Sequence, residues 1–263
     1  MPINSRRSVV PLFLGLSLLI AAGQVALAAD AGPTVPLPAD ARAELEKRLG
    51  KGVVGDPVPA PPLQAPMSYS PHQGSVLTYQ VLDSDGNKWS EAHHVAASTD
   101  AEFSPGLSYA IDKVSTEYMQ ETADGNLVVI AEKDLKQSVL TRFSPGEPLI
   151  IAGLQAGQNR QVKVDVKVAD LSDPTDITHT GSLTITYTYV GAYKVTVPGG
   201  TYNAALIRWD YNGDVGPASI TDTYYRLIAP GAGLIAMVEN VSISAMLFYN
   251  DHTKLGKQFA QMK

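Results

Sequence analysis

The chain has 263 residues, with 20 Lys and Arg against 26 Asp and Glu, 44% hydrophobic residues and no cysteine. This composition predicts a packed globular protein rather than a disordered one. A net charge of −6 without a cluster of basic residues argues against a nucleic-acid partner. The lack of cysteine in this sequence excludes a disulfide scaffold, a thiol nucleophile, a cysteine zinc site and the lipid-bearing cysteine of a bacterial lipoprotein.

Residues 1–28 have the pattern of a signal peptide. Arg6 and Arg7 precede an apolar run over residues 9–22, and small residues follow up to Ala28, after which we expect cleavage. A retained membrane anchor and export by the twin-arginine route are the alternatives. No later segment is apolar enough to span a bilayer, so the mature protein is expected to be periplasmic or secreted, without a transmembrane segment.

Residues 29–73 are expected to form a linker, because nine of the 18 prolines lie between Pro33 and Pro71. A short helix is predicted inside this linker, over residues 38–49, with Leu45 and Leu49 four residues apart. Two leucines make a narrow apolar stripe. A weakly docked arm is therefore favoured over a helix that binds a partner.

Residues 74–263 are predicted to form one all-β domain. The clearest strand is 161–168, where four valines alternate with polar residues so that one face meets the core and the other meets water. The segments 83–87 and 124–126 contain Asp, Gly and Asn, which are typical of exposed hairpin turns. Breaks of this kind leave about ten strands.

Because no helical crossover separates these strands, they should pair with their sequence neighbours as an antiparallel meander. The twist of such a large sheet predicts an open or half-closed β-barrel. Residues 251–263, with Leu255 and Phe259 four apart, are expected to form a short C-terminal helix that covers the apolar end of segment 241–249.

Two segments carry a resemblance to a known family. Residues 189–204 contain a strand ending in Val197-Pro198, a glycine turn, and then Thr201 and Tyr202; residues 224–235 contain an aromatic strand followed by a Pro-Gly-x-Gly turn. Both are similar to elements of a family of exported bacterial domains of unknown function. The resemblance implies a curved antiparallel sheet without an assigned activity. The residues themselves act as sheet-shaping turns, since no helix follows either glycine cluster to hold a phosphate.

No cofactor or metal site is predicted. His93 and His94 are adjacent on a predicted strand, so their side chains point to opposite faces and cannot chelate one ion together. Segment 83–87 matches part of a calcium loop but lacks the third acidic position and the final Glu, so a plain turn is expected.

No catalytic residue can be named from the sequence. It contains neither a G-x-S-x-G elbow nor an S-x-x-K motif. The carboxylate pairs Asp210 with Asp214 and Glu117 with Glu121 are expected to be solvated rather than catalytic. Arg208 and Asp210, two apart on one strand, are expected to form an exposed charge pair worth about 1 kcal/mol at most.

Aromatic residues are the remaining candidates for a site. Tyr and Trp combine apolar area with a polar tip, which suits either a core or contact with a ligand. The candidate ligand-binding residues come from three strands and are Tyr187, Tyr189, Trp209, Tyr211, Tyr224 and Tyr225.

Three functions are compatible with these observations. The leading hypothesis is a noncatalytic protein of the cell envelope that holds an apolar or amphipathic small molecule, or another envelope protein, on a concave β surface. The second is a hydrolase acting on cell-wall or extracellular polymer, which requires ionisable groups that converge in one cleft. The third is a structural or interaction domain, which requires an apolar outer patch or a free edge strand.

Overall fold

The computed structural model describes residues 32–65, 69, 73–241, 243–245, 249–251 and 254–263. The predicted signal peptide, residues 1–28, lies outside the described residues, as does part of the 241–249 segment. No helix in the described ranges is long and apolar enough to cross a membrane.

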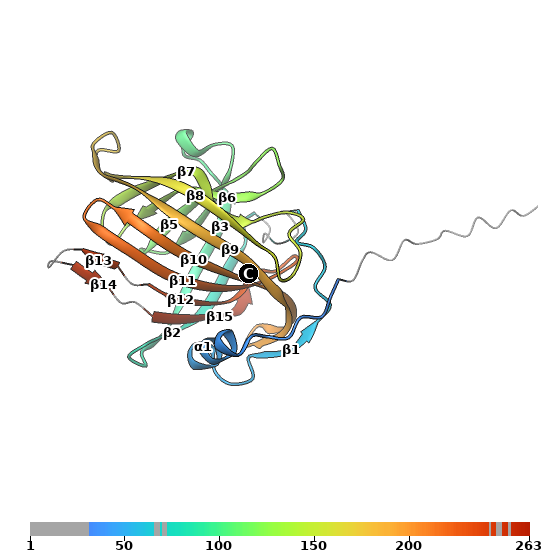
Figure 1. The fold of residues 1–263 in the computed structure, drawn as a ribbon. Coiled ribbons are helices and arrows are strands. Elements are labelled where there is room, and N and C mark those ends of the chain that lie inside the picture. The colour runs from blue at the N-terminus through green and yellow to red at the C-terminus, as the bar shows by residue number, and fades with distance from the viewer. Residues whose placement is uncertain (1–31, 66–68, 70–72, 242, 246–248, 252–253) are drawn as a thin grey trace, which may run out of the picture.

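The described strands form one antiparallel sheet that closes into a twelve-stranded barrel (Figure 1). Strands β2 to β9 follow one another around the wall in sequence order, and β10, β11, β12 and β15 complete the ring. The strands of the barrel are β2 (Val76–Asp83), β3 (Lys88–Ala97), β4 (Leu107–Ile111), β5 (Ser115–Glu121), β6 (Leu127–Asp134), β7 (Val139–Ile150), β8 (Asn159–Asp170), β9 (Ile177–Val197), β10 (Gly200–Val215), β11 (Ala218–Ala229), β12 (Gly233–Asn240) and β15 (Lys254–Met262).

The all-β antiparallel prediction is confirmed, but two details of it were wrong. Residues predicted as a C-terminal helix form strand β15, which pairs with β12 on one side and with β2 on the other. These pairings also close the barrel, which was expected to be open or half-closed. The two errors have one cause: Leu255 and Phe259 fit a strand as well as a helix, and two unpaired strand edges favour the strand.

The predicted hairpins are present. In the turn between β2 and β3, the Asp83 N–H donates to the Asn87 carbonyl (3.1 Å), and Gly86 has a φ of 88°, which glycine adopts without strain. In β8 the four valines of 161–168 point inward: Val164 and Val166 are buried, and the polar residues between them are exposed.

Because the strands are antiparallel neighbours, alternate connections lie at opposite ends of the barrel. The end that carries the β2–β3, β4–β5, β6–β7, β8–β9 and β10–β11 hairpins is called the hairpin end below. A small two-stranded ribbon, β13 (Ile243–Ala245) and β14 (Tyr249–Asp251), pairs with β11 close to this end (Figure 1).

The N-terminal segment first packs along the outer wall of the barrel, as α1 (Ala39–Leu49), and then reaches the other end, as β1 (Val54–Val58). Helix α1 consists mainly of strong helix formers and ends before Gly50, whose φ is 100°. β1 adds to β9 beside the β9–β10 turn. Farther along, the Leu63 N–H donates to the Leu154 carbonyl in the β7–β8 connection (2.9 Å).

The predicted helix is therefore present, and it lies on the outer wall. Leu45 and Leu49 join an apolar cluster that also holds Leu227 and Val238 of the barrel. Gly256 of β15 permits this approach, because a Cβ there would lie 2.5 Å from the Arg48 carbonyl oxygen. The Gln258 side-chain amide donates to the Leu49 carbonyl (2.8 Å) and satisfies an acceptor left free at the end of the helix.

Candidate ligand-binding cavity

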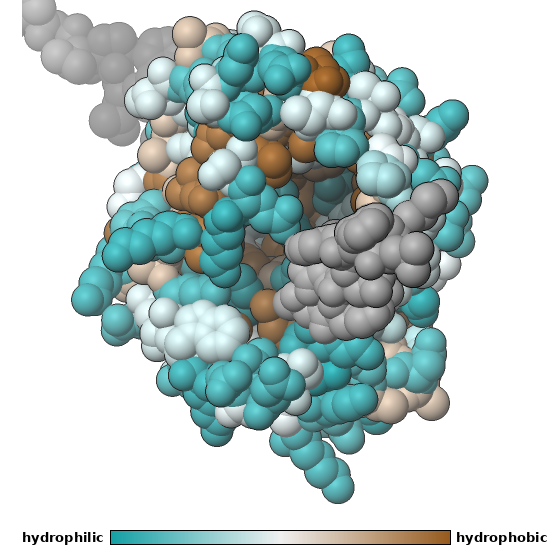
Figure 2. Space-filling view, turned by 90° about the vertical axis from the view of Figure 1, so that its left-hand side faces the viewer, coloured by the Kyte–Doolittle hydropathy of each residue, from teal (hydrophilic) through white to brown (hydrophobic). Residues whose placement is uncertain are grey.

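The barrel interior contains a cavity of about 530 Å³ at its hairpin end. Figure 2 faces this end and shows a hollow with hydrophobic residues visible inside it and hydrophilic residues around it. The size falls within the range usual for small-molecule sites. Among the described residues, the ionisable wall is mostly acidic. It holds three cationic side chains, Lys136, Arg226 and Lys257, against seven carboxylates, namely Glu91, Glu117, Glu132, Asp134, Glu147, Asp222 and Glu239.

A second, smaller space of about 110 Å³ adjoins this cavity. It is lined mainly by apolar side chains, among them Leu107, Met119, Leu127, Leu149 and Ile228. The two spaces share the wall residues Ile111, Glu117, Arg226, Met237 and Lys257. The interior thus offers a larger chamber of mixed polarity, called the polar chamber below because it carries the carboxylates, next to a smaller and mainly apolar one, which we call the apolar pocket.

Two ion pairs stand where the chambers meet. Arg226 of β11 lies with its Nη2 4.0 Å from Glu117 Oε1 of β5, and its guanidinium is 5.1 Å from the centre of the Trp209 ring. Lys257 of β15, which is 5% exposed, places its Nζ 2.7 Å from Glu91 Oε2 of β3. Both cations are therefore matched by a carboxylate, as buried charges generally must be.

His93 belongs to the second of these pairs. Its Nε2 lies 3.2 Å from Glu91 Oε2, and its Nδ1 lies 2.8 Å from the Tyr109 hydroxyl. Burial lowers the pKa of His93, although the bond to Glu91 opposes this, so the imidazole favours its neutral form. Burial alone would raise the pKa of Glu91, but the hydrogen bond with His93 and the charge of Lys257 lower that pKa to about 2.

Three other carboxyl groups of the cavity have raised pKa values. Burial is the largest cause for each. The Tyr211 hydroxyl donates to Glu147, and a hydrogen bond from Tyr224 partly offsets the raised pKa of Glu239. For Glu132, burial and then the negative charges of nearby carboxylates, Glu117 first, raise the pKa to about 8.

Three of the six aromatic candidates form part of the inner wall without facing the larger cavity. The polar atom of each donates to a backbone carbonyl: Tyr187 Oη to Leu149 (3.1 Å), Tyr189 Oη to Pro61 (3.1 Å) and Trp209 Nε1 to Pro148 (2.8 Å). All three side chains are at most 1% exposed. These hydrogen bonds connect β9 and β10 to the last residues of β7 and to the N-terminal segment.

Tyr211 and Tyr224 do line the larger cavity, with their rings 5.3 Å apart in an edge-to-face contact. Burial raises the pKa of both phenols well above the ordinary value, so both remain hydrogen-bond donors. Tyr225, the next residue, points to the outside, where it is 5.7 Å from the Arg208 guanidinium. The sequence-based set therefore contains two cavity residues, three wall residues and one outer residue.

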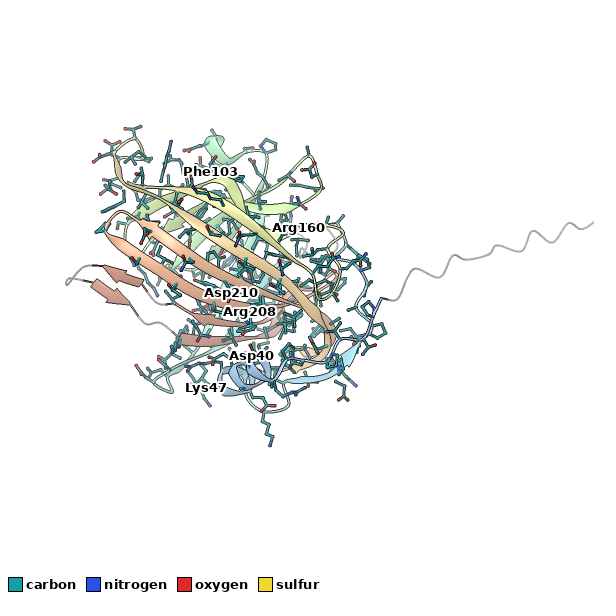
Figure 3. All side chains as sticks on the ribbon, viewed as in Figure 1. Asp40, Lys47, Phe103, Arg160, Arg208 and Asp210 are labelled. Carbon is teal, nitrogen blue, oxygen red and sulfur yellow. The ribbon has the colours of Figure 1, made fainter. Side chains whose placement is uncertain are left out.

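The predicted pair of Arg208 and Asp210 is present on the outer wall, with Nη2 2.8 Å from Oδ1. Figure 3 shows both residues near α1, which carries Asp40. Arg208 Nη1 lies 3.5 Å from Asp40 Oδ2, so this charge group links the barrel to the helix rather than to the cavity.

Sequence reasoning missed most of the charged cavity wall. Glu117 was expected to be solvated, but it faces the interior, whereas Glu121 is exposed at the end of the same strand. A usable signal was present in β11, where Asp222, Tyr224 and Arg226 alternate on one face between two isoleucines. Polar residues at every second position between apolar ones indicate an interior that is not filled by apolar packing.

The two adjacent histidines lie on opposite faces, as expected. His93 is buried in the interior, and His94 is half-buried on the outside, with its Nε2 3.1 Å from Asp112 Oδ1. Among the described residues, no group of three or more His, Asp or Glu side chains is placed to hold one metal ion.

No protein-family model matches the chain, and no curated protein sequence matches it. Three solved bacterial structures show partial similarity of shape. A proposed exported protein with a YmcC-like fold from Bacteroides fragilis has a TM-score of 0.44 at 12% identity, over 75% of this chain and 99% of that one. A proposed lipoprotein from Parabacteroides distasonis has a TM-score of 0.39 at 14% identity, over 75% and 99% of the two chains. The hypothetical lipoprotein YmcC from Escherichia coli has a TM-score of 0.37 at 9% identity, over 71% and 84%.

TM-scores below 0.5 carry no argument about the function of the present barrel. The class of the protein follows from its own structure: a closed twelve-stranded antiparallel β-barrel with a partly polar internal cavity.

Proposed function

We propose that this protein is a noncatalytic binding protein of the cell envelope that holds an amphipathic small molecule inside its barrel. The observation that carries the proposal is the pair of adjoining chambers, one polar and about 530 Å³, the other apolar and about 110 Å³. A molecule with a polar head and an apolar chain fits such a pair, because each part meets a wall of its own polarity.

The chamber order supports entry of the ligand with its apolar part first. The polar chamber lies at the hairpin end, and the apolar pocket lies deeper, beside Leu149 and Tyr69. The N-terminal segment contributes Ala60, Leu63 and Tyr69 to the apolar cluster that contains Leu149 and other residues of the pocket wall. Residues from outside the barrel strands therefore pack around the inner end of the pocket. The expected location in the envelope depends on the signal-like N-terminus.

The proposal is tested with a neutral apolar dye, phenylnaphthylamine, whose fluorescence rises in an apolar environment. We expect the full-length protein to bind the dye, and a long-chain neutral detergent to displace it. Met119→Trp places a large ring in the apolar pocket and is expected to weaken dye binding about tenfold or more.

Met262→Trp is the matched control. Met262 is 45% exposed on β15, so this variant should bind the dye as the wild type does. Circular dichroism verifies that both variants keep the β fold. Equal binding by wild type and Met119→Trp would contradict occupation of the pocket, and the absence of any saturable binding by the wild type would contradict the proposal as a whole.

A hydrolase is the second candidate, and one observation favours it. Ionisable groups converge in the cavity, and their pKa values diverge: that of Glu132 is raised to about 8 and that of Glu91 is lowered to about 2. Such divergence suits general acid and ionised partner roles. The closed wall, however, gives a long polymer no open groove to lie in. Release of soluble fragments from purified peptidoglycan, abolished by Glu132→Gln, would establish the hydrolase.

A further inference from the structure

Two carboxylates face each other inside the barrel. Glu117 of β5 and Glu132 of β6 are direct partners in the antiparallel register, and both line the larger cavity. Like charges directly opposite one another on neighbouring strands destabilise a sheet unless a positive charge compensates them. Arg226 supplies such a charge to Glu117 but not to Glu132, whose raised pKa keeps its carboxyl group protonated at neutral pH.

None of the described cations of the cavity wall forms an ion pair with Glu132. Arg226 is paired with Glu117 and stacked near Trp209, and Lys257 is paired with Glu91 at 2.7 Å. Lys136 is an exposed residue of the β6–β7 turn. In the described part of the chain, no cation or hydrogen-bond donor lies within bonding distance of the Glu132 carboxylate.

Glu132 also lines the cavity. It is half-buried there, which agrees with burial as the first cause of its raised pKa. Glu117, the carboxylate whose charge raises the pKa of Glu132 most, lines both chambers. A group that neutralises Glu132 therefore has to come from the cavity side, next to the entrance of the apolar pocket.

We infer that the ligand carries a protonated amine, which binds between Glu132 and Glu117 while its apolar chain occupies the apolar pocket. This inference rests on the proposed binding function and specifies the chemical class of the head group. A metal ion is a poorer fit, because the described carboxylates are not placed to surround one ion. An ammonium needs only one or two acceptors and a nearby carboxylate.

The test compares three amphiphiles with the same chain and different heads: dodecylamine, dodecyl maltoside and dodecanoate. Each is titrated below its micelle concentration against the full-length protein carrying bound phenylnaphthylamine, near neutral pH. We expect dodecylamine to displace the dye at a concentration about tenfold lower than either of the others, as one charge-assisted hydrogen bond provides.

Glu132→Gln should remove most of this preference and leave displacement by dodecyl maltoside unchanged. Glu121→Gln is the matched control, because Glu121 is an exposed carboxylate at the end of β5. As a second measurement, calorimetry in two buffers of different ionisation enthalpy should show proton release when dodecylamine binds to the wild type, since Glu132 must ionise to accept it.

Equal displacement by the three amphiphiles, or preferential displacement by dodecanoate, would overturn the amine inference and leave the binding function intact. If the wild type binds neither the dye nor any of the amphiphiles, the binding function itself fails. Retention of the dodecylamine preference in Glu132→Gln would also overturn the assignment.

Discussion

At the scale of single residues, the pKa of each carboxyl group inside the barrel depends on the groups that surround it. Glu91 has both a cation and an imidazole within hydrogen-bonding distance, and its pKa falls to about 2. Burial and then the charges of neighbouring carboxylates raise the pKa of Glu132 to about 8. At neutral pH, Glu91 is therefore ionised and Glu132 is protonated, although both are glutamates on the same inner wall.

These two shifts predict an optimum in the pH dependence of stability. The folded protein keeps the Glu132 proton between about pH 5 and about pH 8 while the unfolded chain releases it, so the free energy of unfolding should fall as the pH rises through this range. Below about pH 4.5, Glu91 becomes protonated in the unfolded chain, but in the folded protein it stays ionised down to about pH 2. The free energy of unfolding should therefore also fall as the pH drops through this range.

Urea unfolding at a series of pH values measures this profile. In Glu132→Gln the loss between pH 5 and pH 8 should be smaller than in the wild type, by a difference on the order of 3 kcal/mol. Parallel profiles for the two proteins would show that Glu132 is not a protonated interior carboxyl.

The inward position of Glu132 could not be predicted from the sequence. Strict alternation in β6 would place Val128, Ile130 and Glu132 on one face. The bulge in the pairing of β5 with β6 breaks this parity, so that Glu132 shares the inner face with Val129 and Leu127. The alternation of valines in β8, which has no such break over residues 161–168, was predicted correctly.

At the scale of elements, β15 is the strand that completes the barrel. Phe259 is 4% exposed, and its ring contacts Tyr79 at 5.9 Å and Tyr202 at 6.1 Å between centroids. The Gly199 N–H donates to the Phe259 carbonyl (3.0 Å). One residue of β15 thus ties together β2, the β9–β10 turn and β10.

Phe259→Ala should lower the free energy of unfolding by about 3 to 5 kcal/mol, because it empties a buried site enclosed by rigid strands. Met262→Ala, at an exposed position on the same strand, should change it by about 0.5 kcal/mol or less. Chemical denaturation measures both values. Similar small effects in the two variants would indicate that β15 does not pack between β2 and β12.

The local elements were largely predictable, and their long-range pairing was not. Turn residues and the period of two identified the hairpins, and the four-residue spacing of Leu45 and Leu49 identified α1. The helical spacing of Leu255 and Phe259 misled the prediction for β15, because only the distant edges of β2 and β12 decide between strand and helix there. The aromatic candidates were correctly placed in strands, but their faces depend on the same pairings.

At the scale of the whole molecule, the closed ring of hydrogen bonds distinguishes this barrel from an open curved sheet. Each of the twelve barrel strands has two paired neighbours. A closed ring has no edge at which strands can fray or add a foreign strand.

Hydrogen–deuterium exchange should therefore be slow and comparable in β2, β15 and β9. Exchange in an open sheet would be fastest in the two edge strands, since their amides open without disturbing the rest. Mass spectrometry of peptides from the three strands measures these rates. Rapid exchange confined to β2 and β15 would contradict closure.

The position of the N-terminal segment has a consequence for orientation. β1 pairs with the part of β9 next to the β9–β10 turn, and Figure 1 places it on the side away from the β13–β14 ribbon. Any tether that holds the protein by this side leaves the mouth of the barrel directed outward. Under the proposed function, the ligand then enters from the facing side, not from the surface to which the protein is attached.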